Sequence, residues 1–234
     1  MKTKLLALAL IASASSLLAQ SFINTTFERP PFPAPPASTG GAQFLDWSIW
    51  APGWSHSAGS DTGVLYYELP HVGISQWYLL VRNPGSTFYG NPLAGSYSLA
   101  MHSGYQNNQD FNSPWVSAFI SQTATIPAGS LSLRILATGP FAIFANGNSI
   151  PMVPLGGNQY GGDISGYAGS LTEVKIMSTS PAGNLAFAPT LVDNLQFSNV
   201  AVPEPGTLAL LALGALGWCA CRRRRAITAT HAKD

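Results

Sequence analysis

Short runs in which hydrophobic and polar residues alternate fill the middle of the chain. In Leu131–Ile135 the apolar side chains take every second position, and Glu173–Ile176 repeats the pattern. A period of two places one face of a β-strand against a core and the other toward solvent. No long stretch keeps the 3.6-residue period of an amphipathic helix. The pattern therefore predicts an all-β fold.

Turn signals separate these runs. Asn146-Gly147 lies between Phe141–Ala145 and Asn148–Met152, and both residues tolerate the positive φ that a two-residue type I′ hairpin requires. The spacing of such runs is typical of a two-sheet β-sandwich or jelly roll. Further strands are expected at Val64–Leu69, Gln76–Val81, Ser96–Met101, Val116–Ile126 and Leu191–Phe197.

The N-terminus has the pattern of an export signal. Lysines near the start precede the apolar stretch Leu5–Ile11, and the small residue Ala19 follows. A basic start, a short apolar middle and a small-residue exit are typical of a secretory signal peptide. We expect residues 1–19 to be this signal, with cleavage after Ala14 or Ser16 as the alternatives.

The C-terminus combines a Pro-Glu-Pro triplet, an apolar run and four arginines. The run Thr207–Cys221 is shorter than the roughly 20 residues that span a bilayer comfortably. Arginines after such a run favour the cytoplasmic side of a membrane. A short hydrophobic tail stopped by charge is the arrangement of a sorting signal that is later removed. A plain single-pass anchor is the alternative.

These features resemble a known sorting signal, the PEP-CTERM signal. The resemblance implies recognition by exosortase, a membrane-embedded cysteine transpeptidase of Gram-negative bacteria that make exopolysaccharide. It also implies a transient stay in the inner membrane, followed by the cell surface, outer envelope or extracellular matrix. Glu204 would then serve recognition and not catalysis. The residues that carry the resemblance are Val202, Pro203, Glu204, Pro205, Arg222, Arg223, Arg224 and Arg225.

Two terminal segments thus flank one ectodomain, whose four basic and eight acidic side chains give a net charge of −4. The lack of a basic surface argues against nucleic acid as a partner. Both cysteines lie in the tail, so we expect no disulfide in the ectodomain. The expected division is a signal peptide at 1–19, a β-sandwich at 20–201, a sorting signal at 202–225 (motif 202–206, hydrophobic helix 207–221, basic cluster 222–225) and a cytoplasmic tail at 226–234.

A second resemblance runs along the ectodomain. The stretches "FINTTFE", "FLDW", "GSYSLAMHSG", "ISQTATIPAGSLSL", "DISGYAGSLTEVKI" and "TLVDNLQFS" follow one another in this order. In that order they resemble jelly-roll modules similar to galactose-binding-like and carbohydrate-binding domains. In such modules, acidic residues of the first and last strands help to hold a structural Ca²⁺.

Two acidic residues stand at these places. Glu28 follows Phe27 in the expected first strand, and Asp193 shares the parity of Leu191 and Leu195 in the last one. A carboxylate that faces a core needs hydrogen bonds, a basic partner or a metal. The resemblance suggests that Glu28 and Asp193 share a Ca²⁺ ion with backbone carbonyls, which suits a cation that prefers six to eight oxygen ligands. The alternative is that backbone amides or Arg134 hold Asp193.

Aromatic residues in polar segments are candidates for glycan binding. Trp54, Tyr105 and Trp115 lie in loop-like sequence, and Gln106–Asp110 is rich in amides. Sugar rings stack on flat aromatic faces while their hydroxyl groups bind amides and carboxylates. The alternative is that these rings cover loops at the edge of the sandwich. Trp47, in contrast, is expected in the core.

Catalytic motifs are missing from the sequence. It contains no Gly-x-Ser-x-Gly elbow, no His-Glu-x-x-His motif, no phosphate-binding glycine loop and no paired-cysteine metal spacing. A glycosidase needs two carboxylates across a cleft, and no spacing selects such a pair among the eight acids.

We therefore expect a non-enzymatic, exported protein of the envelope or extracellular matrix that associates with exopolysaccharide. One alternative is a structural or adhesive surface protein that binds no glycan. The other is an enzyme similar to a glycoside hydrolase.

Overall fold

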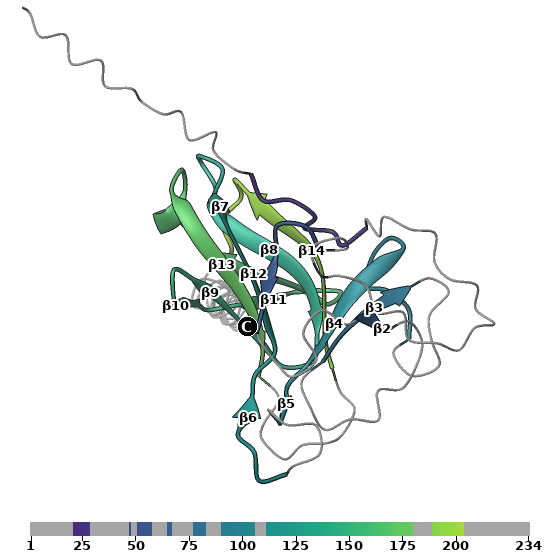
Figure 1. Cartoon of the computed structure of the whole chain (residues 1–234). Coiled ribbons are helices and arrows are strands. Elements are labelled where there is room, and N and C mark those ends of the chain that lie inside the picture. The colour runs from purple at the N-terminus through teal and green to yellow at the C-terminus, as the bar shows by residue number, and fades with distance from the viewer. Residues whose placement is uncertain are drawn as a thin grey trace, which may run out of the picture.

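The structure is a computed structural model that describes residues 21–28, 47, 51–57, 65–66, 77–82, 90–105, 111–179 and 189–203. These residues form two sheets that pack against each other, as Figure 1 shows. The predicted all-β sandwich is confirmed. The expected signal peptide and the hydrophobic helix at 207–221 lie outside the described residues.

The first sheet has five antiparallel strands. Its central strand β13 pairs with β7 on one side and with β9 on the other. Val174 and Ile176 of β13 are fully buried, so the predicted alternation is confirmed. The order is β1 (Ser55–His56), β7 (Phe119–Thr125), β13 (Leu171–Ser178), β9 (Phe141–Ala145) and β10 (Asn148–Ile150).

The second sheet has seven strands. Its described neighbours are antiparallel, except that β2 and β3 run parallel. The order is β11 (Val153–Gly156), β12 (Gln159–Asp163), β8 (Ser132–Thr138), β14 (Thr190–Ser198), β4 (Tyr97–His102), β3 (Trp77–Arg82) and β2 (Leu65–Tyr66).

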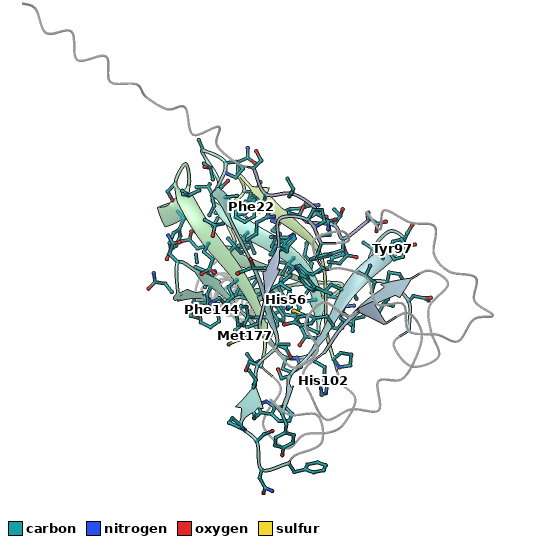
Figure 2. The ribbon with its side chains drawn as sticks, viewed as in Figure 1. Phe22, His56, Tyr97, His102, Phe144 and Met177 are labelled. Atoms are coloured by element: carbon teal, nitrogen blue, oxygen red, sulfur yellow. The ribbon has the colours of Figure 1, made fainter. Side chains whose placement is uncertain are left out.

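A two-stranded ribbon and a short helix complete the described fold. Strands β5 (Gly104–Tyr105) and β6 (Trp115–Val116) form a separate ribbon, and the short 3₁₀ helix η2 (Ser165–Tyr167) links β12 to β13. In Figure 1 the ribbon lies at one end of the sandwich, and β14 finishes near the other end. Figure 2 places Phe22 at the end where β14 finishes and His102 toward the ribbon.

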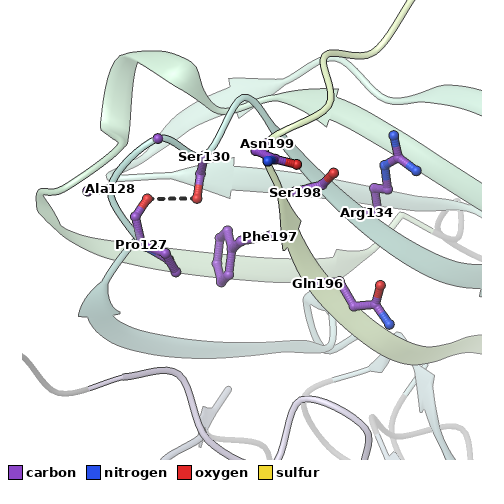
Figure 3. Close-up of a pocket in the computed structure, with 9 residues that line it drawn as sticks. Pro127, Ala128, Ser130, Arg134, Gln196, Phe197, Ser198 and Asn199 are labelled. Carbon is purple, nitrogen blue, oxygen red and sulfur yellow. Dashed lines mark hydrogen bonds between the residues drawn. The ribbon is translucent and has the colours of Figure 1, made fainter.

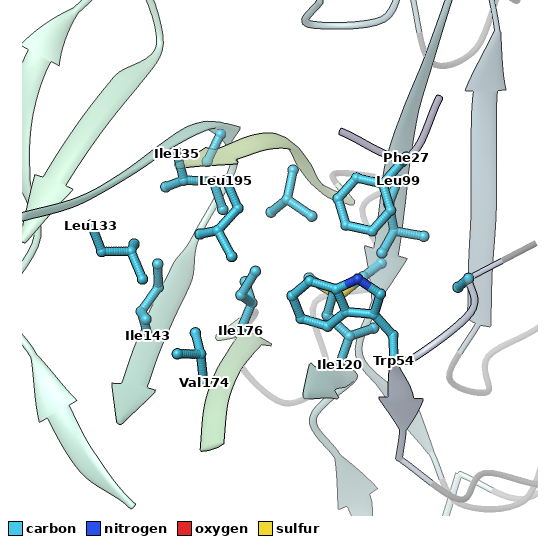
Figure 4. Packing of buried hydrophobic residues seen from close by; sticks show 14 of the residues in the cluster. Phe27, Trp54, Leu99, Ile120, Leu133, Ile135, Ile143, Val174, Ile176 and Leu195 are labelled. Carbon is cyan, nitrogen blue, oxygen red and sulfur yellow. The ribbon is translucent and has the colours of Figure 1, made fainter. Parts of the chain in front are cut away.

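The hydrophobic core lies between the two sheets. Side chains from both layers meet there, and Figure 4 shows Ile120, Ile143 and Ile176 of one sheet with Leu99 and Leu133 of the other. All five are fully buried. Removal of this apolar surface from water stabilises the sandwich, which suits an ectodomain without cysteines.

The hairpin between β9 and β10 has the predicted turn. Asn148 pairs with Ala145, so the loop holds two residues, and Asn146 and Gly147 have φ values of 47° and 80°. Both values lie in the left-handed region that a type I′ turn requires.

One pair of strands lacks a clear sequence signal. β11 and β12 contain Pro154 and the pair Gly161-Gly162, residues that are depleted in strands. β11 lies at the edge of its sheet, where a proline without an N–H is tolerated. The expected strand Val116–Ile126 is in fact divided into β6 and β7.

The expected first strand at Phe27 is wrong. Residues 21–28 form no strand, and Phe27 has a φ of 53° beside a turn that the Phe27 N–H closes on the Asn24 carbonyl at 3.4 Å. The segment nevertheless lies beside the last strand, because the Leu195 N–H donates to the Thr25 carbonyl at 2.9 Å.

A β-bulge interrupts β14. Its register against β8 shifts between Asp193 and Gln196, and Asn194 has a φ of 49°. One extra residue in a strand reverses which face the following side chains occupy. Leu195 therefore belongs to the main core, whereas Leu191 packs in a second cluster with Val81 and Ala100.

The bulge corrects the expected parity of Asp193. Leu191 and Asp193 stay on one face, but Leu195 and Phe197 fall on the other, against the main core or its rim. Asp193 consequently lies on the face of the seven-stranded sheet that is turned away from the first sheet.

Candidate functional site

Asp193 is a buried carboxylate held by three hydrogen-bond donors. Oδ2 accepts from the Ala94 N–H at 3.1 Å and from the Ser98 hydroxyl at 2.7 Å, and Oδ1 accepts from the Asn194 N–H at 2.6 Å. Burial raises the pKa of Asp193 to about 6, and the nearby Glu28 charge acts in the same direction, against these hydrogen bonds. The side chain thus holds the turn that leads into β4.

Glu28 holds the same turn from the N-terminal segment. Its Oε1 accepts from the Ser96 N–H at 2.8 Å and from the Tyr97 N–H at 3.3 Å. Gly95, with a φ of +53°, lies directly under the carboxylate, and a Cβ there would come within 2.0 Å of Glu28 Oε1. We call Glu28, Asp193 and the turn 94–98 the carboxylate clamp.

The carboxylate clamp contains both residues that were predicted to bind Ca²⁺. Both carboxylates of the clamp face N–H or O–H donors, and the described residues contain no group of three or more His, Cys, Asp or Glu side chains that could hold a metal. This arrangement fits the alternative in which backbone amides hold Asp193. The like-charge repulsion between Glu28 and Asp193 is the feature that a cation would relieve, so the ion stays a prediction.

Trp54 is not at the surface, and its prediction as a glycan-binding residue is wrong on this point. Its side chain is only 4% exposed and packs on Phe27, with ring centroids 5.9 Å apart. Its Nε1–H donates to the Ile23 carbonyl at 3.1 Å and lies 3.3 Å from the Asn24 carbonyl. The N-terminal segment therefore covers Trp54. Trp47, 7% exposed, is in the core as predicted.

Tyr105 and Trp115 lie together on the β5–β6 ribbon. They are direct partners across the two strands, and their rings meet edge to face with centroids 5.2 Å apart. Both side chains are half-buried. The structure thus brings together two of the three residues that the sequence selected for glycan binding. The amide-rich segment 106–110 lies outside the described residues.

Phe111 joins this pair and was missed by the sequence prediction. Its ring lies 5.5 Å from that of Tyr105 in an edge-to-face arrangement, and 57% of the residue is exposed. A phenylalanine within a polar segment was the available signal. We call Tyr105, Phe111 and Trp115 the aromatic ribbon.

The chain leaves the sandwich beside β12. The Ser132 hydroxyl donates to the Val200 carbonyl at 2.7 Å, and Val202 lies so near Gly161 that a Cβ there would be 2.9 Å from its Cγ2. Val202 is half-buried and Pro203 is exposed. Glu204, Pro205 and the arginines Arg222–Arg225 lie outside the described residues.

The C-terminal segment also matches a family model. Residues 201–225 match the model described as the PEP-CTERM protein-sorting motif. The chain carries a PEP-CTERM sorting motif. The motif implies an exported protein that transits the membrane and is sorted by an exosortase.

The other comparisons add no relative. No curated protein and no solved structure matches the chain. The part of the chain that the structure describes also contains no helix with the length and hydropathy of a membrane span.

Proposed function

We propose that this PEP-CTERM protein is a non-enzymatic component of the cell surface or extracellular matrix of a Gram-negative bacterium, and that it associates with exopolysaccharide. The aromatic ribbon is the observation that carries the proposal. It presents three aromatic rings at one end of the sandwich, and Phe111 is more than half exposed.

The geometry of the ribbon suits a carbohydrate. Tyr105 contacts both Phe111 and Trp115 edge to face, with interplanar angles of 71° and 86°. Such packing holds the rings at an angle to one another, so that their faces are not stacked together. A sugar can lay its C–H surface on an open aromatic face, and polar neighbours can bind its hydroxyl groups.

Three of the described carboxylates, Glu28, Asp163 and Asp193, hold turns, which favours a structural role for them. A glycosidase needs one carboxyl group that donates a proton and a second one across the scissile bond. Glu28 and Asp193 instead hold a turn, and Asp163 accepts from the Ser165 N–H at 2.8 Å, which lowers its pKa. A lowered pKa opposes the role of a general acid at neutral pH.

The position of the sorting motif supports exosortase processing of a finished fold. β14 ends at Ser198, and the match to the motif begins at residue 201. Removal of the chain beyond that point would leave every described strand in place. We therefore infer that the sandwich is the part delivered to the surface or matrix.

Retention by exopolysaccharide tests the proposal. Full-length protein in mild detergent is passed over the producer's own polymer, immobilised on beads. Loss of one aromatic contact is worth about 1 kcal/mol, so we expect Trp115→Ala and Phe111→Ala each to weaken retention severalfold. Leu171→Ala is the matched control, because Leu171 is 63% exposed on β13 of the five-stranded sheet.

Two other outcomes of this experiment would favour the alternative functions. Wild-type protein that is not retained would refute the glycan role and favour an adhesive role without glycan. Release of new reducing ends from the polymer would instead identify a hydrolase.

A further inference from the structure

A polar pocket lies at the end of the sandwich where β14 finishes, away from the aromatic ribbon. Figure 3 shows it between the turn at 127–130, Arg134 of β8 and residues 196–199. Its volume is about 390 Å³, within the range of about 300–1,000 Å³ that is usual for small-ligand sites. Among the described residues, no acidic side chain lines it.

Arg134 is the basic side chain that lines this pocket. Its Nε is buried and makes no hydrogen bond with any described residue. A guanidinium group offers a planar fork of hydrogen-bond donors. Because Nε is itself closed to solvent, a ligand would meet the terminal nitrogens of the fork, and a carboxylate can accept two parallel hydrogen bonds from them.

The neighbours of Arg134 are amides. Gln196 is its direct partner across β8 and β14, so the two side chains share one face of the sheet. The Gln196 Nε2 donates to Asn194 Oδ1 at 2.6 Å, and the residue is exposed. Asn199 is exposed at the rim of the pocket. Amide groups of this kind bind sugar hydroxyls.

Phe197 lines the pocket from the other side of β14. Its ring packs on Phe22 with centroids 4.9 Å apart and points away from Arg134, as Figure 3 shows. Arg134, Gln196 and Asn199 form the other side of the pocket, which we call the arginine subsite.

We propose that the arginine subsite binds a carboxylate-bearing sugar of the uronic acid type. The carboxylate would pair with Arg134, and ring hydroxyl groups would reach Gln196 and Asn199. This inference rests on the proposed association with exopolysaccharide and names the class of polymer. Because the ectodomain has a net charge of −4, its overall field repels anions, so recognition must come from this one cation at short range.

Titration with monosaccharides tests the subsite. Full-length protein in a neutral detergent at low ionic strength is titrated with glucuronate and, separately, with glucose, and binding is followed by calorimetry. We expect saturable binding of glucuronate that weakens with added salt, and no saturable binding of glucose. Arg134→Gln should weaken glucuronate binding at least tenfold, and Arg134→Lys, which keeps the charge but loses the fork, should weaken it less.

Lys175→Gln is the matched control. Lys175 is the other Lys or Arg with a described side chain, and it lies on β13 of the five-stranded sheet, whereas Arg134 lies on the seven-stranded sheet. Its Nζ lies 4.8 Å from the centroid of the Phe119 ring on the neighbouring strand β7. This variant should bind glucuronate as the wild type does. Thermal melts of all variants report whether they fold.

Three results would overturn the inference. They are the absence of saturable glucuronate binding to wild-type protein, equal binding of glucose and glucuronate, and unchanged glucuronate affinity in Arg134→Gln. Failure of the subsite differs from failure of the proposed function. If retention on the polymer depends on Trp115 and not on Arg134, the proposed function stands and the subsite is refuted. If the wild-type protein is not retained, the proposed function is refuted, and the titration still decides whether the subsite binds glucuronate.

Discussion

Trp54 and Trp115 stand in similar polar sequence, yet the structure uses them in opposite ways. Trp54 is 4% exposed and donates a hydrogen bond to Ile23, 31 residues away in the chain. Trp115 is half-buried on a two-stranded ribbon and packs on Tyr105, ten positions earlier in the sequence. One ring is part of the core, and the other belongs to an accessible cluster.

The difference shows that a long-range partner decides which aromatic ring is buried. Gln122 of β7 accepts from the Ile23 N–H at 2.9 Å and so helps to hold the N-terminal segment over Trp54. No described segment plays this part for Phe111, which remains 57% exposed. Burial of Trp54 depends on contacts between residues far apart in the sequence, whereas the aromatic ribbon is held by contacts between residues close in the sequence.

The largest expected effect is on stability in the interior. Trp54→Ala removes a buried ring and leaves a cavity beside Phe27, and such changes cost about 3–5 kcal/mol. We expect a large fall in the urea midpoint of the full-length protein. Trp115→Ala is the paired control and should lower the midpoint much less. Equal losses in the two variants would contradict the contrast between core and ribbon.

Calcium tests the carboxylate clamp. A Ca²⁺ ion shared by Glu28 and Asp193 predicts that excess Ca²⁺ raises the melting temperature, with about 2.7 kcal/mol gained at 100 times its dissociation constant. Chelator should reverse the rise, and Glu28→Gln should abolish it. A melting temperature that responds to neither Ca²⁺ nor chelator would leave hydrogen bonding as the clamp's role.

The pH dependence of stability tests Asp193 directly. Its pKa is raised from 3.8 in the unfolded chain to about 6 in the fold, so the folded state favours the protonated form. The stabilisation is complete below pH 3.8 and is lost as the pH rises through about 6, on the order of 1–3 kcal/mol in total.

Asp193→Asn isolates this contribution, because the variant has no group that titrates at this position. The difference in unfolding free energy between wild type and variant should change between about pH 4 and pH 6 and stay constant above pH 7. A difference that is flat across this window would show that Asp193 titrates normally.

The smallest expected effect on stability is at Phe111 of the aromatic ribbon. Phe111→Ala should change the unfolding free energy by no more than about 0.5 kcal/mol, because the ring is largely exposed. The same variant should bind exopolysaccharide more weakly, as proposed above. A large loss of stability would place Phe111 with the structural aromatics and would remove its role in binding.

Local patterns predicted the regular part of the fold well. The alternation in β8 and β13 and the Asn146-Gly147 turn act between near neighbours in the chain, and all three have the predicted structure. The parity of β14 failed because one extra residue at Asn194 reverses the faces. A bulge of this kind is stabilised by neighbouring segments, here Thr25, and leaves no clear local signal.

The candidate sites were predicted only in part. Tyr105 and Trp115 were found because their polar surroundings suggested a surface, but the same reasoning misplaced Trp54. Arg134 appeared only as a possible partner of Asp193. The structure instead places it opposite Gln196, beyond the bulge, in a pocket that no described acidic side chain lines.

The sequence by itself determined the sorting motif, the strand-forming alternation and the two-residue hairpin, because each depends on residues close together in the chain. Only the tertiary structure decided which tryptophan is buried, which face Asp193 occupies and that the Nε of Arg134 has no hydrogen-bond partner among the described residues. Burial and pairing depend on contacts between residues far apart in sequence, and those contacts exist only once the two sheets have packed.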